Sequence, residues 1–129
     1  MNVPDSLKRI SASVGERGHS SPADVEAVEA ELARNPTSAD LWIFRGNLIQ
    51  IAEGGRWSLQ DALESYRTAL KYDPASAEAH EEIGHFLDAV EGKPAEAEPY
   101  FRKAIELGGG TTARQGLEQV LEELKGGAG

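Results

Sequence analysis

Two histidines and two glutamates form the stretch of this 129-residue sequence that comes closest to a catalytic motif. In H-E-x-x-H motifs, two histidines four residues apart lie on one helix face and bind zinc, while the glutamate acts as a base. The segment His80-Glu81-Glu82-Ile83-Gly84-His85 spaces its histidines five residues apart, which turns them about 140° from each other on a helix. We therefore expect no metal site, with His80 at a seam between helices and His85 facing outward.

A glycine-rich turn is the second candidate for chemistry. The segment Gly108-Gly109-Gly110-Thr111-Thr112-Ala113 fits the G-x-G-x-x-A pattern, whose turn brings backbone N–H groups to the phosphates of a dinucleotide. That pattern works after a β-strand, whereas the preceding residues 104–107 have a helical pattern. We expect one helix to end here and the next to begin, and we expect no cofactor; a backbone nest for an anion is the alternative.

Carboxylates are numerous, with 22 Asp and Glu residues against 13 Lys and Arg residues, which gives a formal net charge of -9. Most of them, such as Glu64 and Glu122, have the spacing of solvated helix faces, and no nucleophile, base and orienting group come together in the sequence. We therefore expect no catalytic residues and a protein that is not an enzyme. A non-catalytic regulatory subunit of an enzyme is a weaker alternative.

The same charge limits the partners. Nucleic acid and anionic membranes would be repelled, because the densest basic groups are only the pairs Lys8–Arg9 and Arg102–Lys103. The sequence has no cysteine, no apolar run of signal-peptide length among its first residues, and no run approaching the ~18 residues of a membrane span. We expect a soluble, cytoplasmic protein without nucleic-acid or membrane partners.

The elements that position these residues are predicted to be helices, because apolar residues recur at steps of three and four. Glycines and prolines interrupt this pattern, and a possible capping residue precedes several stretches, namely Ser21, Thr37, Ser58 and Thr112. We expect helices near residues 22–34, 39–53, 58–72, 76–91, 94–107 and 111–125. These helices are expected to form one helical domain over residues 21–125. A flexible arm (1–20), with one helical turn near Leu7 and Ile10, precedes the domain, and a flexible tail (126–129) follows it.

One pattern of residues occurs twice. Its positions are Trp42, Gly46, Ala62, Tyr66, Ala69 and Pro74 in the first copy and His80, Gly84, Ala97, Phe101 and Ala104 in the second. A separation of 38 residues is shared by three pairs of landmarks, Trp42/His80, Gly46/Gly84 and Pro36/Pro74. A glycine in a helix interior costs about 1 kcal/mol relative to alanine, so the two glycines predict a close approach of the partner helix. Tyr66 and Phe101 are expected to fill the space there.

These residues resemble the W-x2-L-G-x2-Y…A-x3-F…P pattern of the tetratricopeptide repeat (TPR) family. The resemblance covers residues 39–107, with a half-repeat helix before them and a closing helix after them. It implies an all-α protein, an α-α superhelix of about six helices in antiparallel hairpins, that serves as a protein-binding scaffold. Relative to the family period of about 34 residues, the first unit has four extra residues, at the turn 54–57, and the second about one, near 92–94.

If the helices stack as in that family, the first helix of each hairpin lines a concave groove. The expected groove residues are Asp40, Ile43, Asn47, Gln50 and Ile51 on one helix and Glu78, Glu81, His85 and Asp88 on the other. One half of this groove carries apolar and amide groups, and the other half is acidic. The predicted partner is therefore a protein or peptide that is basic or neutral and partly apolar. Ordinary solvated helix faces are the alternative interpretation.

Self-association is the main alternative function. Two hairpins are fewer than the ~3 repeats usually needed to bury a repeat core, so a second copy could cover the apolar end faces in a homo-oligomer or in a larger complex. Trp57, in a glycine-flanked turn, is interpreted either as tucked over a hairpin end or as an anchor for a partner. The arm is a further place where a partner could bind.

Overall fold

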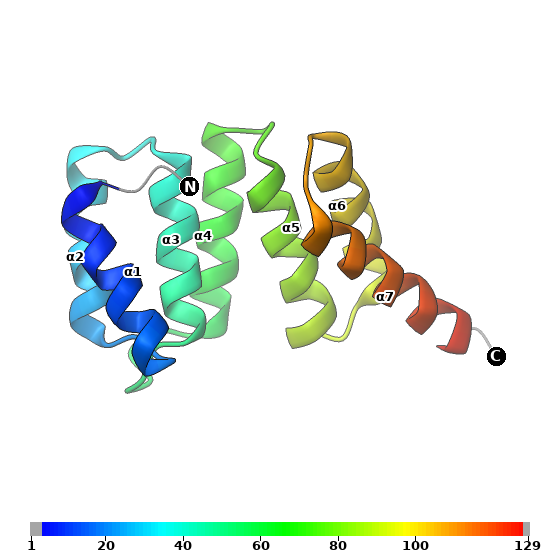
Figure 1. Cartoon of the computed structure of the whole chain (residues 1–129), viewed down its shortest axis with the longest axis horizontal. Coiled ribbons are helices and arrows are strands. Elements are labelled where there is room, and N and C mark those ends of the chain that lie inside the picture. Colours follow the sequence, from blue (N-terminus) through cyan, green and yellow to red (C-terminus); the bar gives the residue numbers. More distant parts are fainter. Residues whose placement is uncertain (1–3, 128–129) are drawn as a thin grey trace. The chain divides into compact units, whose positions relative to one another are not determined.

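The computed structural model describes residues 4–127, and their regular structure is helical (Figure 1). The elements are α1 (Asp5–Arg17), α2 (Pro22–Arg34), α3 (Ala39–Gln50), α4 (Leu59–Tyr72), α5 (Ala77–His85), the π-helical turn η1 (Phe86–Val90), α6 (Pro94–Glu106) and α7 (Thr111–Gly127). Within the described residues, the one extended pairing is an isolated bridge between Ser20 and Ala52. The predicted all-α fold is confirmed, and residues 4–127 contain seven α-helices in place of about six.

The chain divides into two compact units, Met1–Asp73 and Pro74–Gly129. Unit 1 holds α1 to α4, and unit 2 holds α5, η1, α6 and α7. The helical domain predicted over residues 21–125 includes parts of both units. No helix of the described part is both long enough and apolar enough to cross a bilayer.

Serine side chains cap four of the helices. Ser21 and Ser58 each form a capping box with the aspartate three residues later, and such a cap contributes roughly 1 kcal/mol. Ser38 caps α3, one residue beyond the expected Thr37. Thr112 lies inside α7 and is not a cap. Two of the four expected capping residues are therefore confirmed.

A tyrosine ring packed against a glycine holds α3 and α4 together in unit 1. Tyr66 of α4 is fully buried, and a Cβ atom on Gly46 of α3 would lie only 2.6 Å from its ring. No side chain larger than hydrogen fits at that distance, so the glycine permits the approach of the two helices. Ala62 and Ala69, about one turn before and after the tyrosine, are also fully buried. The close approach predicted at Gly46 is confirmed.

Arg45, next to this contact, joins three helices. Its guanidinium group pairs with Glu29 of α2 at 3.2 Å and donates a hydrogen bond to the hydroxyl of Ser65 on α4 at 2.5 Å. Helix α2 packs against α3 and contributes the fully buried Val25 and Val28 to the core. A cation at the position where the TPR pattern has leucine thus ties α2, α3 and α4 together.

A phenylalanine ring has the same role in unit 2, where it contacts two glycines. Phe101 of α6 is fully buried, and Cβ atoms on Gly84 of α5 and Gly116 of α7 would lie 3.0 Å and 2.4 Å from its ring. Ala97 and Ala104, on either side of Phe101 in α6, are fully buried. The approach predicted at Gly84 is confirmed. Gly116 also brings α7 into contact with the Phe101 ring, which the sequence pattern did not predict.

The remaining repeat positions lie near the turns between hairpins. The indole N–H of Trp42 donates to the Pro36 carbonyl at 2.9 Å, and His80 contacts the Ser76 carbonyl through Nδ1 at 2.8 Å. Each of these two rings therefore secures the turn that precedes its own helix. Pro74 is exposed in the turn between α4 and α5.

The N-terminal segment contains more helix than predicted. Residues 5–17 form α1 instead of a single helical turn, so the prediction of a structureless arm is wrong for them. Leu7 and Val14 of α1 are buried, and Gly18 ends the helix with a left-handed φ of 78°. At the other end, α7 continues to Gly127 into the predicted tail. The parts of the arm and the tail at residues 1–3 and 128–129 lie outside the described residues.

Two predicted helices end earlier than expected. Helix α3 stops at Gln50 and not at residue 53, because the backbone that follows pairs with Ser20. The helix expected over 76–91 changes at Phe86 into η1, where the N–H of Glu91 bonds to the Phe86 carbonyl at 3.2 Å. A π-turn holds one residue more than an α-turn, so η1 can accommodate the extra residue that the sequence predicted near 92–94.

The phenylalanine–glycine contact in unit 2 gives a stability prediction. Gly116→Ala places a methyl group against the Phe101 ring, which has little room to move because Gly84 also lies against it. We expect the free energy of unfolding to fall by ~1–3 kcal/mol, measured by urea unfolding followed by circular dichroism. Gly126→Ala, in the same helix but with open space around it, is the control and should cause no loss. Equal effects of the two substitutions would contradict the contact.

Candidate functional site

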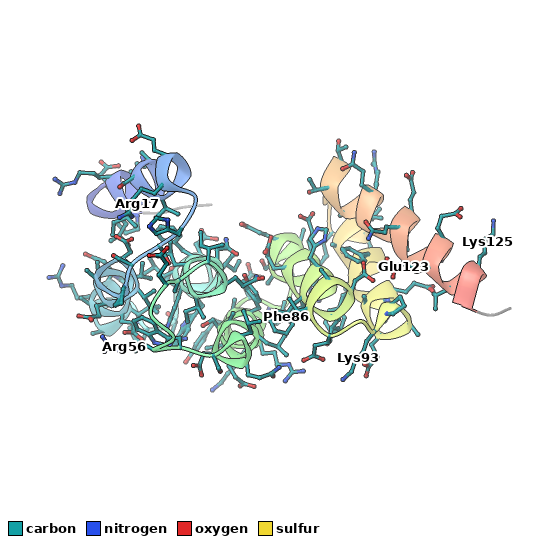
Figure 2. The ribbon with its side chains drawn as sticks, turned by 90° about the horizontal axis from the view of Figure 1, so that it is seen from below. Arg17, Arg56, Phe86, Lys93, Glu123 and Lys125 are labelled. Carbon is teal, nitrogen blue, oxygen red and sulfur yellow. The ribbon has the colours of Figure 1, made fainter. Side chains whose placement is uncertain are left out.

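A cleft between α1 and α3 is the candidate binding site in unit 1. Its volume is about 450 Å³, within the ~300–1,000 Å³ typical of ligand pockets. Its lining residues are Lys8, Ser11, Val14 and Gly15 of α1, and Phe44, Asn47, Leu48 and Ile51 of α3 and its C-terminal cap. In Figure 2, α1 (blue) lies on the opposite side of α3 from α4 (green). This site is termed the α1–α3 cleft.

Ser20 anchors the link between α1 and α2 to the end of α3. Its hydroxyl donates to the Leu48 carbonyl at 2.6 Å, and its N–H donates to the Ile51 carbonyl at 2.9 Å. Its own carbonyl accepts from the N–H of Glu53 at 3.1 Å, and the residue is fully buried. The last carbonyls of a helix have no intrahelical partner, so Ser20 supplies part of the cap that α3 needs. The position of α1 beside α3 follows from this anchor.

An ion pair ties α1 to α2 on the other side of the same link. Arg17, in the last turn of α1, lies 2.8 Å from the carboxylate of Asp24, in the first turn of α2. Burial works to raise the pKa of Asp24, but hydrogen bonds from the Ser21 N–H and from Arg17 outweigh it, and the pKa is lowered. Asp24 therefore stays ionised and keeps its attraction for Arg17 well below neutral pH.

The α1–α3 cleft has an apolar floor. Val14, Phe44 and Leu48 are buried, whereas Ile51, which also lines the cleft, is 42% exposed. An apolar side chain that covers Ile51 would remove it from water, which is favourable by roughly 25 cal/mol per Å² of apolar surface. The one charged lining residue among those described is Lys8, which pairs with Asp5 at 2.9 Å. The cleft can therefore hold an apolar group more readily than a charged one.

A hydrogen-bond network orients the amide of Asn47 on the cleft wall. The hydroxyl of Tyr66 donates to Asn47 Oδ1 at 2.7 Å and accepts from Gln50 Nε2 at 2.6 Å. Because Oδ1 is engaged, the NH₂ group of Asn47 is the part that can donate to a bound ligand. The tyrosine whose ring packs against Gly46 thus also positions the polar group of the cleft.

The groove residues predicted on α3 have different surroundings. Asn47 and Ile51 line the cleft, and Gln50 is linked to Asn47 through Tyr66. Ile43 is fully buried, so its assignment to an open groove is wrong. Helix α3 has buried residues on most of its sides, and its sequence pattern therefore cannot separate groove from core. Asp40 is half-buried in the first turn of α3 and does not line the cleft.

The groove residues predicted in unit 2 lie on α5 and η1, and two of them engage α7. Glu81 accepts a hydrogen bond from Thr112 of α7 at 2.8 Å and lies 3.8 Å from Nε2 of His85. The His85 side chain is 44% exposed, and its ring packs edge-on against Phe101 with 4.9 Å between centroids. Glu78, in the first turn of α5, is half-buried. This acidic half is thus less open than the sequence suggested.

Asp88 of η1 is the second residue that engages α7. Its Oδ1 atom is buried and has no hydrogen-bond partner within the described structure. Burial, and then the hydrogen bond and the negative charge of Glu123 on α7, raise the pKa of Asp88 from 3.8 to about 6. Two carboxyl groups in contact favour sharing one proton over ionising together. Asp88 therefore faces Glu123 and is unsuited to attract a cationic partner while it is protonated.

Three further features of the sequence were candidates for function: the possible metal ligands, the glycine-rich turn and Trp57. Within residues 4–127, no three His, Asp or Glu side chains are grouped as a metal site would require. The glycine-rich turn follows α6 and precedes α7, with Gly108 at a φ of 96° and the Gly109 N–H bonded to the Ala104 carbonyl at 2.7 Å. Trp57 is half-buried with the guanidinium of Arg56 4.7 Å from its ring centroid, and Arg56 also pairs with Glu26. These contacts favour the tucked position of Trp57.

The sequence pattern does not predict most of the cleft, because half of the lining residues belong to α1. The available signal was the spacing of Leu7, Ile10 and Val14, which recur at steps of three and four as in an amphipathic helix. Ser11 and Ser13, which lie between Ile10 and Val14, weakened that signal. The contact of α1 with α3 is tertiary, so no local pattern could have predicted it.

Comparison with known proteins does not assign the chain to a family. No family model matches the sequence, and no curated protein matches it. Function is therefore inferred from the geometry of the chain itself.

The Asp88–Glu123 contact predicts how stability depends on pH. The folded chain holds a proton on Asp88 up to about pH 6, whereas the unfolded chain releases it near 3.8. The contribution of this proton to stability is thus present below about pH 4 and is lost as the pH rises through about 6. Asp88→Asn should remove this dependence and raise the melting temperature at neutral pH, in calorimetric unfolding between about pH 4 and about pH 7.

Glu122→Gln removes one charge from the exposed side of α7 and is the matched control. It should leave the pH dependence between about pH 4 and about pH 7 as it is in the parent chain. If Asp88→Asn behaves like this control, the contact between Asp88 and Glu123 is not formed.

Proposed function

We propose that this chain is a protein-interaction module that holds a short apolar segment of a partner protein in the α1–α3 cleft. The observation that carries the proposal is one open cleft that combines a buried apolar floor, the exposed Ile51 and an oriented amide donor on Asn47. Ligand sites have this composition, since apolar walls supply the affinity and a few positioned polar groups fix the orientation.

The resemblance to the TPR family supports the same class of function. In each of the two hairpins, α3 with α4 and α5 with α6, a glycine of the first helix meets an aromatic ring of the second. This packing agrees with the pattern on which the resemblance is based. We regard the chain as two TPR-like hairpins, which α2 precedes and α7 follows in the sequence. Helical repeats characteristically offer elongated surfaces to other proteins.

The proposed partner segment is apolar, and neutral or basic. Among the described residues that line the cleft, Lys8 is the one charged residue and none is acidic. A buried charge without a partner would be costly there, so the side chain that enters the cleft is apolar. The net charge of -9 on the whole chain repels acidic segments and attracts basic ones from a distance. A cytoplasmic location, as expected from the sequence, belongs to the same proposal.

A cleft-filling substitution tests this proposal. Ser11→Phe places a ring in the cleft, and Ala12→Phe, at an exposed neighbouring position of α1, is the matched control. Peptides are selected from a displayed library on the whole parent chain, and their affinities are measured by fluorescence anisotropy. We expect them to carry a large apolar residue and to bind Ser11→Phe at least ~10-fold more weakly than the other two proteins, a loss of about 1.4 kcal/mol.

Amide chemical shifts measured by NMR during the same titration locate the site. Binding in the cleft should shift the signals of Gly15, Asn47 and Ile51, which line it from both helices. Peptides that bind all three proteins equally, with shifts confined to unit 2, would show that the α1–α3 cleft is not the binding site.

A further inference from the structure

One side of α7 carries a row of leucines that unit 2 does not cover completely. Helix α7 packs against α6, with Gly116 at the Phe101 ring and Val120 fully buried. Leu121 lies on another side of the helix and is 37% exposed. Leu117 and Leu124, four residues before it and three after it, are half-buried on the same side. Leucines at this spacing form a stripe that suits packing against another helix.

Charged residues of opposite sign border this stripe. A hollow of about 500 Å³ on α7 is lined by Leu121 together with Glu118, Glu122 and Lys125. Figure 2 shows Lys125 in the last part of α7, directed away from the helix. Within the described part of the chain, Glu118 and Lys125 form no ion pair with other residues. Two turns of helix separate them, which is too far for them to pair with each other.

We infer that this face, made of Leu117, Glu118, Leu121, Leu124 and Lys125, binds the same face of a second copy of the chain. When two α7 helices lie antiparallel with Leu121 opposite Leu121, Leu117 of one copy approaches Leu124 of the other. The same register brings Glu118 of each copy next to Lys125 of the other. Two-fold symmetry repeats the contact, so one surface forms two equivalent ion pairs.

The charges select both the orientation and the partner. In a parallel pair, two-fold symmetry would place the Glu118 and Lys125 residues of the two copies on opposite sides of the leucine seam, where they could not form ion pairs with each other. A purely basic or purely acidic segment of another protein would satisfy one of these residues and oppose the other. A second copy in antiparallel orientation satisfies both. This contact is distinct from the α1–α3 cleft, since every residue in it belongs to α7.

The dimer is expected to be weak. One exposed helix face buries less than the roughly 1,200–2,000 Å² of a standard stable interface. Each copy also carries a net charge of -9, which opposes association. The dimer should therefore form only at high protein concentration.

Sedimentation equilibrium of the whole chain, from roughly 10 µM to roughly 1 mM, tests the inference. The mass should rise towards that of a dimer in the parent chain and stay lower in Leu121→Gln. Glu118→Lys and Lys125→Glu should each weaken association by about tenfold, because like charges then meet across the two-fold axis. The double variant should recover the association of the parent chain, because its ion pairs are restored with the signs exchanged.

Glu16→Lys is the matched control, since it makes the same change of net charge as Glu118→Lys at an exposed position of α1. It should reduce the magnitude of the negative net charge without weakening the dimer. Circular dichroism shows whether each variant is folded. Leu121 is exposed, so the substitution Leu121→Gln should leave the core intact. A monomer at every concentration would overturn the inference. So would a dimer that is insensitive to Leu121→Gln, or a double variant as weak as the single ones.

Discussion

The packing of an aromatic ring against a bare stretch of helix backbone is the contact on which the rest of this structure depends. Tyr66 meets Gly46 in unit 1, and Phe101 meets Gly84 and Gly116 in unit 2. A glycine in a helix interior costs about 1 kcal/mol. Full burial of a large apolar side chain contributes roughly 1.5–3 kcal/mol. The burial of a completely enclosed ring therefore outweighs the cost of the glycine that permits it. Both rings are fully buried, and small alanines beside them let the helices come close enough to enclose them.

The same two rings determine what the surface can present. The hydroxyl of Tyr66 reaches past the glycine contact to Asn47, so the polar group of the α1–α3 cleft is positioned from the core of unit 1. Phe101 brings α7 against α6, and α7 in turn engages carboxylates on α5 and η1. A residue that the sequence pattern places on a groove face can therefore already be in contact with another helix of its own unit. The cleft remains open because α1 is held at its end, by Ser20 and Arg17, and its middle residues Ser11 and Gly15 are small.

The sequence was sufficient for those parts of the fold that depend on local pattern. Serine caps and prolines placed α2 and α6 within a residue of their observed bounds, and the repeated glycines correctly predicted where helices approach. It failed where tertiary contacts decide the outcome. Residues 5–17 are rich in serine, yet three apolar side chains and the anchor at Ser20 are enough for a helix against α3. The burial of Ile43 and the pairing of Asp88 with Glu123 depend on neighbours distant in sequence, which a helical wheel cannot show.

Proton NMR of the three glycines is the most direct test of the central claim. A ring packed against a glycine shifts the α-protons of that glycine upfield and lies close enough for nuclear Overhauser effects. The structure predicts such effects from the Tyr66 ring to Gly46, and from the Phe101 ring to both Gly84 and Gly116. Gly126, with open space around it, provides the unshifted reference. If the α-protons of the three glycines resonate like those of Gly126 and show no contact with either ring, the account of how these helices are held together is wrong.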